Sequence, residues 1–256
     1  MKQMLICDDG KVNEVAPLCR ALGLGIEVQA FFNPTVFEED ESSVARHKQA
    51  ISGIALRSLH GCFWDLCPGS RDAKVREVAR KRFEQSCLVA TRLDVQHIVF
   101  HHGYVPHTSE PDGWLKRTTE FWLSFLEGKD QNISFHIENI LDWDPQLLSD
   151  VVKSINRPNV DINLDIGHAH CESRTPVLKW IEQLGGQIGY VHMHDNHGQR
   201  DEHLGFGQGT LPLEEACIAL NEYAPNAIWA LEAEGAGIQQ SIDWLREKGI
   251  VKFKSP

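Results

Sequence analysis

The chain has 256 residues, of which 42% are hydrophobic and 24% are charged, and its formal net charge at pH 7 is -11. This composition is ordinary for a globular protein and argues against a long disordered tail, and the length suits one domain, residues 1–256, with a single large core. Because an acidic chain has few cations with which to neutralise phosphates, the charge makes nucleic acid an unlikely partner.

The beginning of the chain contains no sustained apolar stretch before Asp8 and Asp9. We therefore expect neither a signal peptide nor a membrane anchor. The seven cysteines are odd in number, scattered and free of any C-x-x-C pair, which favours reduced thiols over a disulfide framework. Both observations predict a cytoplasmic protein without a membrane partner.

Strand-like and helix-like stretches alternate along the whole chain. Eight stretches are predicted to be strands, at residues 3–7, 25–31, 54–60, 95–101, 133–138, 160–165, 188–194 and 227–232. Helical patterns lie between them, for example over residues 72–92 and 114–126. In the first, we expect an apolar face made by Val75, Val78, Ala79, Phe83 and Leu88; in the second, by Leu115, Phe121, Trp122 and Phe125. The repeated order of strand and then helix predicts an α/β architecture with parallel strands.

The later predicted strands are polar on one face. In the stretch 133–138, Phe135 and Ile137 alternate with His136 and Glu138, and the same alternation recurs in 160–165, 188–194 and 227–232. A strand of an open, doubly covered sheet is apolar on both faces, whereas a closed barrel can hold a polar site at the top of its interior. The pattern therefore favours a (β/α)8 TIM barrel over a doubly wound sheet.

Ionisable residues stand at or near the ends of six predicted strands: His60, His101, Glu138, Asp165, His192 and Glu232. In a barrel those ends converge on one face, where active sites of this fold lie. Any one of these residues could be structural, and a lone histidine more often is. Burying three carboxylates in one pocket without a cation, however, would cost roughly several kcal/mol unless protonation or positively charged partners reduced the repulsion. Carboxylate and imidazole together suit a divalent metal, and we predict a metal-dependent enzyme.

Five sequence strings, taken in order, resemble the xylose isomerase-like barrels. They are FHIEN (135–139), NLDIGHAH (163–170), VHMHD (191–195), DEHLGFGQG (201–209) and ALEAE (230–234). That superfamily contains sugar and sugar-phosphate isomerases and epimerases together with endonuclease IV. The resemblance covers about two thirds of the chain, from Leu59 to Glu234, and is specific as a set.

In the isomerases and epimerases, the resemblance implies one divalent metal (manganese, magnesium, cobalt or zinc) held by Glu138, Asp165, His192 and Glu232. His192 is preferred to His194 because Asp195 stands three positions after it, as in the family pattern. The parity of the strand does not separate the two histidines, so His194 stays an alternative ligand.

The resemblance further implies a sugar or sugar phosphate as the small-molecule partner, and it allows a homodimer. The reaction would be isomerisation or epimerisation by proton transfer through a metal-stabilised enediolate. Glu138 and Glu232 would flank the reacting carbon, one removing the proton and the other returning it. His168 would bind and polarise a substrate oxygen.

Endonuclease IV provides the alternative prediction, a trinuclear zinc phosphodiesterase acting on abasic DNA. Its zinc-binding pattern matches nine positions of this chain: His60, His101, Glu138, Asp165, His168, His192, Asp201, His203 and Glu232. The acidic net charge, the short chain and the segment HGCFWDLCPGSRD after Leu59 favour a small molecule instead. A metal- or sugar-binding barrel without catalysis is the third possibility.

Two loops near the predicted site allow two interpretations each. Phe63 and Trp64 could stack on a sugar or a base, or could simply cover the mouth of the barrel. The glycines of 205–209 could let backbone amides approach a phosphate, or could make the turn into the next helix. For the glycines we favour the turn.

Overall fold

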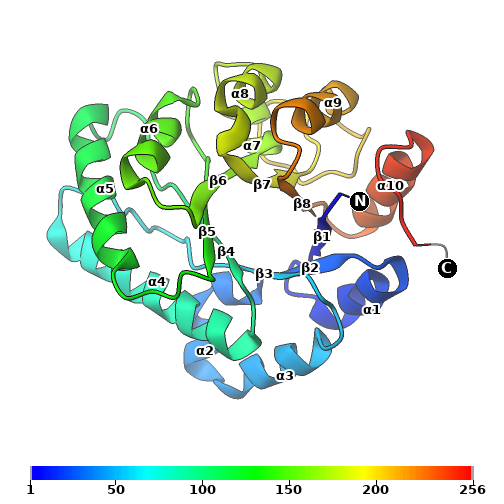
Figure 1. Cartoon of the computed structure of the whole chain (residues 1–256), viewed down its shortest axis with the longest axis horizontal. Helices are drawn as coiled ribbons and strands as arrows, with labels where there is room; N and C mark the ends of the chain where they lie inside the picture. The colour runs from blue at the N-terminus through cyan, green and yellow to red at the C-terminus, as the bar shows by residue number, and fades with distance from the viewer. Residues whose placement is uncertain (1, 255–256) are drawn as a thin grey trace.

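The computed structural model describes residues 2–254 and forms a closed barrel of eight parallel strands in sequence order (Figure 1). The (β/α)8 barrel predicted from the sequence is confirmed. The strands are β1 (Met4–Cys7), β2 (Gly25–Val28), β3 (Arg57–His60), β4 (His97–His101), β5 (Ser134–Glu138), β6 (Val160–Asp165), β7 (Ile188–Met193) and β8 (Ile228–Leu231).

Helices surround the barrel and cover the outer faces of its strands (Figure 1). None of them, within residues 2–254, is long and apolar enough to span a membrane. They are α1 (Val12–Leu22), α2 (Pro34–Glu39), α3 (Ser42–Ala50), α4 (Ala73–Leu93), α5 (Pro111–Leu126), α6 (Gln146–Ile155), α7 (Ile166–Cys171), α8 (Val177–Leu184), α9 (Leu213–Tyr223) and α10 (Ala236–Glu247), with 3-10 turns η1 (Ala30–Phe32) and η2 (Gly185–Gln187).

All eight predicted strands form, and most end within one or two residues of the expected bounds, but two strands are three residues shorter than expected. The stretch 25–31 leaves the sheet after Val28 because the 3-10 turn η1 begins at Ala30. The stretch 54–60 enters the sheet only at Arg57, because the amide of Ile54 still bonds to the carbonyl of Ile51 in the turn after α3. Neither difference displaces a predicted site residue, since His60 still ends β3 and no candidate ligand was expected in 25–31.

The predicted apolar face of the helix over 72–92 is partly wrong. Val75, Val78 and Leu88 are 36%, 50% and 43% exposed, whereas Ala79 and Phe83 are buried as expected. Helix α4 packs through these two and a set of small or late residues that includes Ser86, Cys87, Ala90 and Leu93. Small side chains allow a close approach to the barrel, so apolar residues such as Val78 and Leu88 do not all mark the buried face here.

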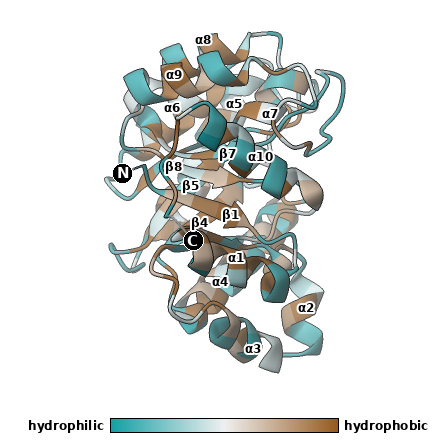
Figure 2. Ribbon diagram, turned by 90° about the vertical axis from the view of Figure 1, so that its right-hand side faces the viewer, coloured by the Kyte–Doolittle hydropathy of each residue, from teal (hydrophilic) through white to brown (hydrophobic). Residues whose placement is uncertain are grey.

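Apolar side chains form two separate layers. The larger one lies between the strands and the helices, where the rings of Phe83 and Phe100 stack at 3.9 Å. The smaller one lies inside the barrel: Leu5, Cys7, Val99, Tyr190, Ile228 and Ala230. Figure 2 shows the strands predominantly brown between helices of mixed colour. The small inner layer leaves most of the barrel interior to polar residues.

The strand register places the ionisable residues at one level. His101 on β4 pairs with Glu138 on β5, and Asp165 on β6 pairs with His192 on β7. Inward-facing residues of neighbouring strands at one level form a layer of the barrel interior. The topmost layer therefore consists of imidazoles and carboxylates.

Candidate metal centre

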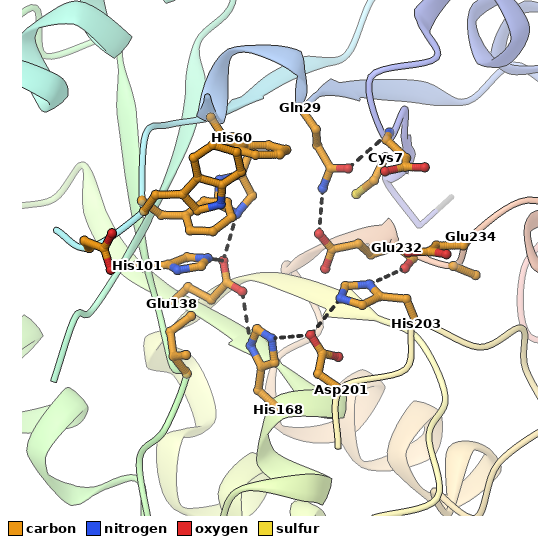
Figure 3. Close-up of a pocket in the computed structure, with 17 residues that line it drawn as sticks. Cys7, Gln29, His60, His101, Glu138, His168, Asp201, His203, Glu232 and Glu234 are labelled. Carbon is orange, nitrogen blue, oxygen red and sulfur yellow. Dashed lines mark hydrogen bonds and ion pairs between the residues drawn. The ribbon is translucent and has the colours of Figure 1, made fainter. Parts of the chain in front are cut away.

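The carboxyl ends of the strands open into a cavity of about 480 Å³ (Figure 3). Seven of the nine candidate ligands line it directly: His60, His101, Glu138, His168, Asp201, His203 and Glu232. The other two, Asp165 and His192, are fully buried among these residues. The structure thus brings together all nine residues selected from the sequence.

Four residues from neighbouring strand ends converge beside this cavity, and we call them the four-residue centre: Glu138, Asp165, His192 and Glu232. The Nδ1 atom of His192 lies 3.3 Å from Glu138 Oε1, 3.2 Å from Glu232 Oε2 and 3.9 Å from Asp165 Oδ2. Glu138, Asp165 and His192 are almost completely buried. One imidazole nitrogen and three carboxylates therefore face one another within a few ångströms.

The residues of the four-residue centre fit a divalent cation. One atom of each, namely Glu138 Oε2, Asp165 Oδ2, His192 Nδ1 and Glu232 Oε2, is buried without a hydrogen-bond partner among residues 2–254. Buried polar atoms are almost always paired, so four orphaned ones from one cluster need an explanation. Oxygen and imidazole nitrogen donors without thiolate suit zinc, manganese or a similar metal.

The charges of the four-residue centre depend on several imidazoles. Burial alone would raise the pKa of the Glu138 carboxyl, but the positive charges and hydrogen bonds of His192, His101 and His168 hold that pKa well below its usual value. Burial raises the pKa of Glu232, and the opposing charges of His192 and His203 offset this only in part. The pKa of His192 is raised well above its ordinary value because carboxylates outweigh its burial. The pKa shifts of Glu138 and His192 favour opposite charges in the barrel mouth, whereas that of Glu232 favours its neutral form.

A second group shares Glu138 with the four-residue centre. His60 Nε2 lies 3.5 Å and His101 Nε2 lies 3.8 Å from Glu138 Oε2. The ring of Phe63 stacks on His101 at 4.1 Å, and the Nδ1 atom of His60 is 3.0 Å from the carbonyl oxygen of Gly61. These contacts fix both rings with Nε2 toward Glu138.

A third group lies across the cavity. Its Asp201 Oδ2 atom is 3.2 Å from His168 Nε2 and 2.8 Å from His203 Nε2. The Nδ1 atoms of these histidines are held by the backbone oxygens of Asn139 and Glu232, at 3.0 and 2.8 Å. In Figure 3 the interactions run continuously from His60 through Glu138, His168 and Asp201 to His203.

The two histidines at the end of β7 face different groups. His192 belongs to the four-residue centre, whereas His194 Nε2 lies 3.2 Å from Asp165 Oδ1 and 3.5 Å from Asp201 Oδ1. The ring of His194 also stacks on that of His203 at 4.2 Å. The geometry favours His192 as the ligand of the four-residue centre, although strand parity could not separate the two.

Asp195 organises the loop that carries Asp201 and His203. Its carboxylate accepts hydrogen bonds from the backbone amides of Gly207, Gly209 and Leu211 at 2.9 to 3.1 Å. A Cβ atom on Gly209 would lie 2.3 Å from the carbonyl oxygen of Asn196, so a side chain does not fit there. This arrangement supports the interpretation of the glycines as turn-forming residues.

Sequence reasoning missed several residues that contact the candidate ligands and hold them in place. Glu27 on β2 is completely buried, and its Oε1 atom is 3.0 Å from His192 Nε2. Gln29 donates a 2.6 Å hydrogen bond from Nε2 to Glu232 Oε1. Asn139 bonds to both backbone groups of Asp165, at 2.9 Å each. The only signal for Glu27 was one acid within the apolar stretch GIEV.

The fold and the site define a (β/α)8 barrel with a ligand cluster at its carboxyl face. Residues 17–248 match the model of the xylose isomerase-like TIM barrel family, and the chain belongs to this family.

Relatives share about a quarter of their residues with the chain. It is 29% identical over 189 residues to an uncharacterized protein of Methanocaldococcus jannaschii, covering 68% of this chain and 63% of that protein. It is 25% identical over 191 residues to a probable endonuclease 4 of Mycobacterium leprae, covering 70% of this chain and 73% of that protein. The chain thus spans less than two thirds of the archaeal relative.

Solved structures of the same fold include zinc-bound and epimerase examples. A Thermus thermophilus protein from a crystal soaked with zinc chloride is 25% identical, with a TM-score of 0.76 over 98% of both chains. The IOLI protein with a bound zinc atom is 16% identical, with a TM-score of 0.77 over 99% of this chain and 100% of that one. A D-psicose 3-epimerase crystallised with D-fructose is 20% identical, with a TM-score of 0.71 over 94% of this chain and 90% of that one.

Proposed function

We propose that the protein is a metal-dependent isomerase or epimerase of a small sugar. The observation that carries this proposal is the placement of Glu138 and Glu232. They come from β5 and from the residue after β8, three strands apart around the barrel, yet both carboxylates lie within 3.3 Å of the same His192 nitrogen. Both also line the cavity. Two carboxylates that reach one point from different sides are suited to moving a proton between the faces of one carbon.

The cavity suits an uncharged, ring-sized substrate. Phe32, Phe63 and Trp64 form an aromatic wall, and the ring centroid of Phe32 lies 4.9 Å from that of Phe63 and 5.1 Å from that of Trp64. Within the described part of the chain, no lysine or arginine lines this cavity. Because a phosphate is usually held by such cations, the lining favours a sugar without phosphate.

The proposed mechanism divides the work between the ligand cluster and the acid–base residues. A divalent cation held by Glu138, Asp165, His192 and Glu232 would polarise the substrate carbonyl and stabilise the enediolate left by proton removal. One of Glu138 and Glu232 removes the proton, and the other returns it, to the opposite face in epimerisation or to the neighbouring carbon in isomerisation. His168 would bind a substrate oxygen through Nε2, which lies at the cavity 3.2 Å from Asp201 Oδ2, since its Nδ1 atom faces the carbonyl oxygen of Asn139.

Hydrogen exchange tests this proposal across the whole class of sugars. The purified protein is incubated with manganese, magnesium, cobalt or zinc and a panel of ketoses and aldoses in deuterated water. We expect deuterium at a carbon next to the carbonyl, together with the epimer or isomer, for at least one sugar. If no sugar of the panel exchanges, with or without added metal, the proposed activity is wrong.

A second candidate function, hydrolysis of phosphodiesters in abasic DNA, is favoured by one specific observation. The nine candidate ligands comprise the four-residue centre and two further groups, around His101 and Asp201, and a single metal ion in the four-residue centre would leave those two groups without metal. Three zinc ions could together activate water and hold a phosphate. The metal content of the purified protein and a nicking assay on abasic DNA separate the two functions. About one metal per chain without nicking supports the sugar enzyme, whereas about three zinc ions with nicking that a chelator abolishes supports the phosphodiesterase.

A further inference from the structure

Glu27 lies at the floor of the barrel mouth, directly behind the four-residue centre. Its side chain is completely buried, and it is surrounded by donors from three other strands, β1, β3 and β7. His192 Nε2 lies 3.0 Å from Oε1, the hydroxyl of Tyr190 donates to Oε2 at 2.7 Å, and the hydroxyl of Ser58 donates to Oε2 at 3.2 Å. These contacts fix the carboxylate in place.

His192 is oriented differently from the other histidines of the cluster. In His60 and His203 the Nδ1 atom faces a backbone carbonyl oxygen, and Nε2 points to a carboxylate. In His168 the Nδ1 atom lies 3.0 Å from the carbonyl oxygen of Asn139 and 3.4 Å from Glu138 Oε1, and Nε2 points to Asp201. In His192 the roles are reversed, because Nε2 faces the Glu27 carboxylate and Nδ1 faces Glu138 and Glu232. Among these four histidines, His192 is the one held by a buried carboxylate that is not itself a candidate ligand.

This difference matters for metal binding. A carboxylate accepts a hydrogen bond more strongly than a neutral carbonyl does. When an imidazole donates one N–H to a carboxylate, its ring orientation and tautomer are fixed and the other nitrogen becomes a more basic ligand. Glu27 therefore leaves the Nδ1 lone pair of His192 directed at the three carboxylates of the four-residue centre.

We propose that Glu27 is a positioning residue that fixes His192 and thereby makes the four-residue centre the first of the three groups to bind metal. The inference rests on the proposed metal centre. It predicts an order of loading: the first metal equivalent enters between Glu138, Asp165, His192 and Glu232. The groups of His101 and Asp201, which within residues 2–254 contact no buried carboxylate other than candidate ligands, then fill more weakly.

Metal titration of the full chain tests this order. The wild type and Glu27→Gln are freed of metal, titrated with Zn²⁺ against a coloured chelator, and titrated with Co²⁺ while the visible absorption of each equivalent is recorded. For Glu27→Gln we expect the first equivalent to bind about 10- to 100-fold more weakly, with a changed Co²⁺ spectrum. Later equivalents should change less than about threefold, because their ligands do not touch Glu27.

Two further variants keep the test decisive. Asp142→Asn removes another buried carboxylate that touches none of the four ligands, and it should bind the first equivalent as the wild type does. Tyr190→Phe removes one donor to Glu27 and should weaken the first equivalent by a smaller factor, about threefold to tenfold, even if Glu27→Gln fails to fold.

The outcomes separate this inference from the proposed function. If the wild type binds metal and neither Glu27→Gln nor Tyr190→Phe changes the first equivalent, the role of Glu27 is wrong while the metal centre stands. If both variants weaken all equivalents alike, the loading order is wrong. If the wild type binds no metal, the proposed function itself fails, and the inference fails with it.

Discussion

Two buried groups, each with histidine and carboxylate side chains, lie near the mouth of the barrel. In one group the pKa shifts of a histidine and a carboxylate favour their charged forms, and in the other they favour the neutral forms. In the four-residue centre, carboxylates raise the pKa of His192, and imidazoles lower that of Glu138. In the pair of His102 and Asp142, the two side chains are also buried and 3.4 Å apart. There, burial lowers the pKa of His102 to about 3 and raises that of Asp142 to about 7.

The comparison shows that the number of partners decides whether buried charge persists. A single imidazole does not compensate the burial of Asp142, so the pair is neutral below about pH 7. Glu138 lies within 4 Å of His60, His101, His168 and His192, and this ring of donors keeps it charged. The candidate site therefore differs from the isolated buried pair in the number of imidazoles that surround a buried carboxylate.

The largest expected effect is on turnover, which should depend on the four-residue centre and not on the pair of His102 and Asp142. Glu138→Gln removes the proposed acid–base group, and we expect turnover to fall by about 10² to 10⁴, because acid–base catalysis contributes that much. Asp142→Asn is the matched control, a buried carboxylate changed to the corresponding amide, and it should keep turnover within about threefold. Steady-state kinetics on the sugar found by exchange measures both. Equal losses in the two variants would contradict the distinction.

Metal should stabilise the protein through the four-residue centre and not through the Asp142 pair. With free metal at about 100 times its dissociation constant, we expect the unfolding free energy to rise by about 2.7 kcal/mol, since metal binds the folded state. Chelator should reverse this gain. In Asp165→Asn most of it should be absent, and in Asp142→Asn it should be intact. Urea unfolding with and without metal is the measurement, and a full gain in Asp165→Asn would argue against the proposed ligands.

The Asp142 pair should produce a smaller, pH-dependent effect. Because the folded pKa of Asp142 is raised to about 7, its stabilising contribution is fully present below the unfolded pKa of about 3.9 and is lost as pH rises through about 7. Asp142→Asn has no such titration. Between about pH 5 and about pH 8, the wild type should therefore lose on the order of 2 kcal/mol relative to this variant. Urea unfolding at both pH values checks the sign, and a constant difference would refute it.

The smallest expected effect concerns substrate binding in the cavity that leads to the four-residue centre. Trp64 is 52% exposed at the cavity wall, so its loss should leave the fold intact. For Trp64→Ala we expect KM to rise about threefold to tenfold with kcat nearly unchanged, as for one lost aromatic contact of about 1 kcal/mol. Tyr223→Ala, exposed on α9 and outside the cavity lining, is the control. A large change in kcat would place Trp64 nearer the chemistry.

The positions of the ligands could be predicted because strand periodicity and barrel topology together determine them. Once eight parallel strands were expected, His60, His101, Glu138, Asp165, His192 and Glu232 had to meet at the carboxyl face. Period-two patterns show which side chains face inward, and the repeated order of strand and helix shows at which end of the barrel they gather. Neither depends on the details of packing.

What the pattern could not supply depends on rotamers and on contacts distant in sequence. His192 and His194 have the same parity, and only the turn after β7 sends them to different groups. Glu27 lies 165 positions from the histidine that it holds. The buried face of α4 was misjudged because small residues such as Ala79 pack closer than Val78. Such choices follow from the three-dimensional arrangement of neighbouring elements rather than from local periodicity.

The loop anchored by Asp195 has a consequence for how such barrels diversify. Six candidate ligands lie at or near strand ends, but Asp201 and His203 lie on this loop. His203 has a left-handed backbone with φ of 47°. The loop is tied to the barrel through the β-bridge between Asp195 and Leu204 and through hydrogen bonds to the carboxylate of Asp195. An ancestor could therefore gain or shed a metal-binding group by remodelling one loop, while every strand and its ligands stayed in place.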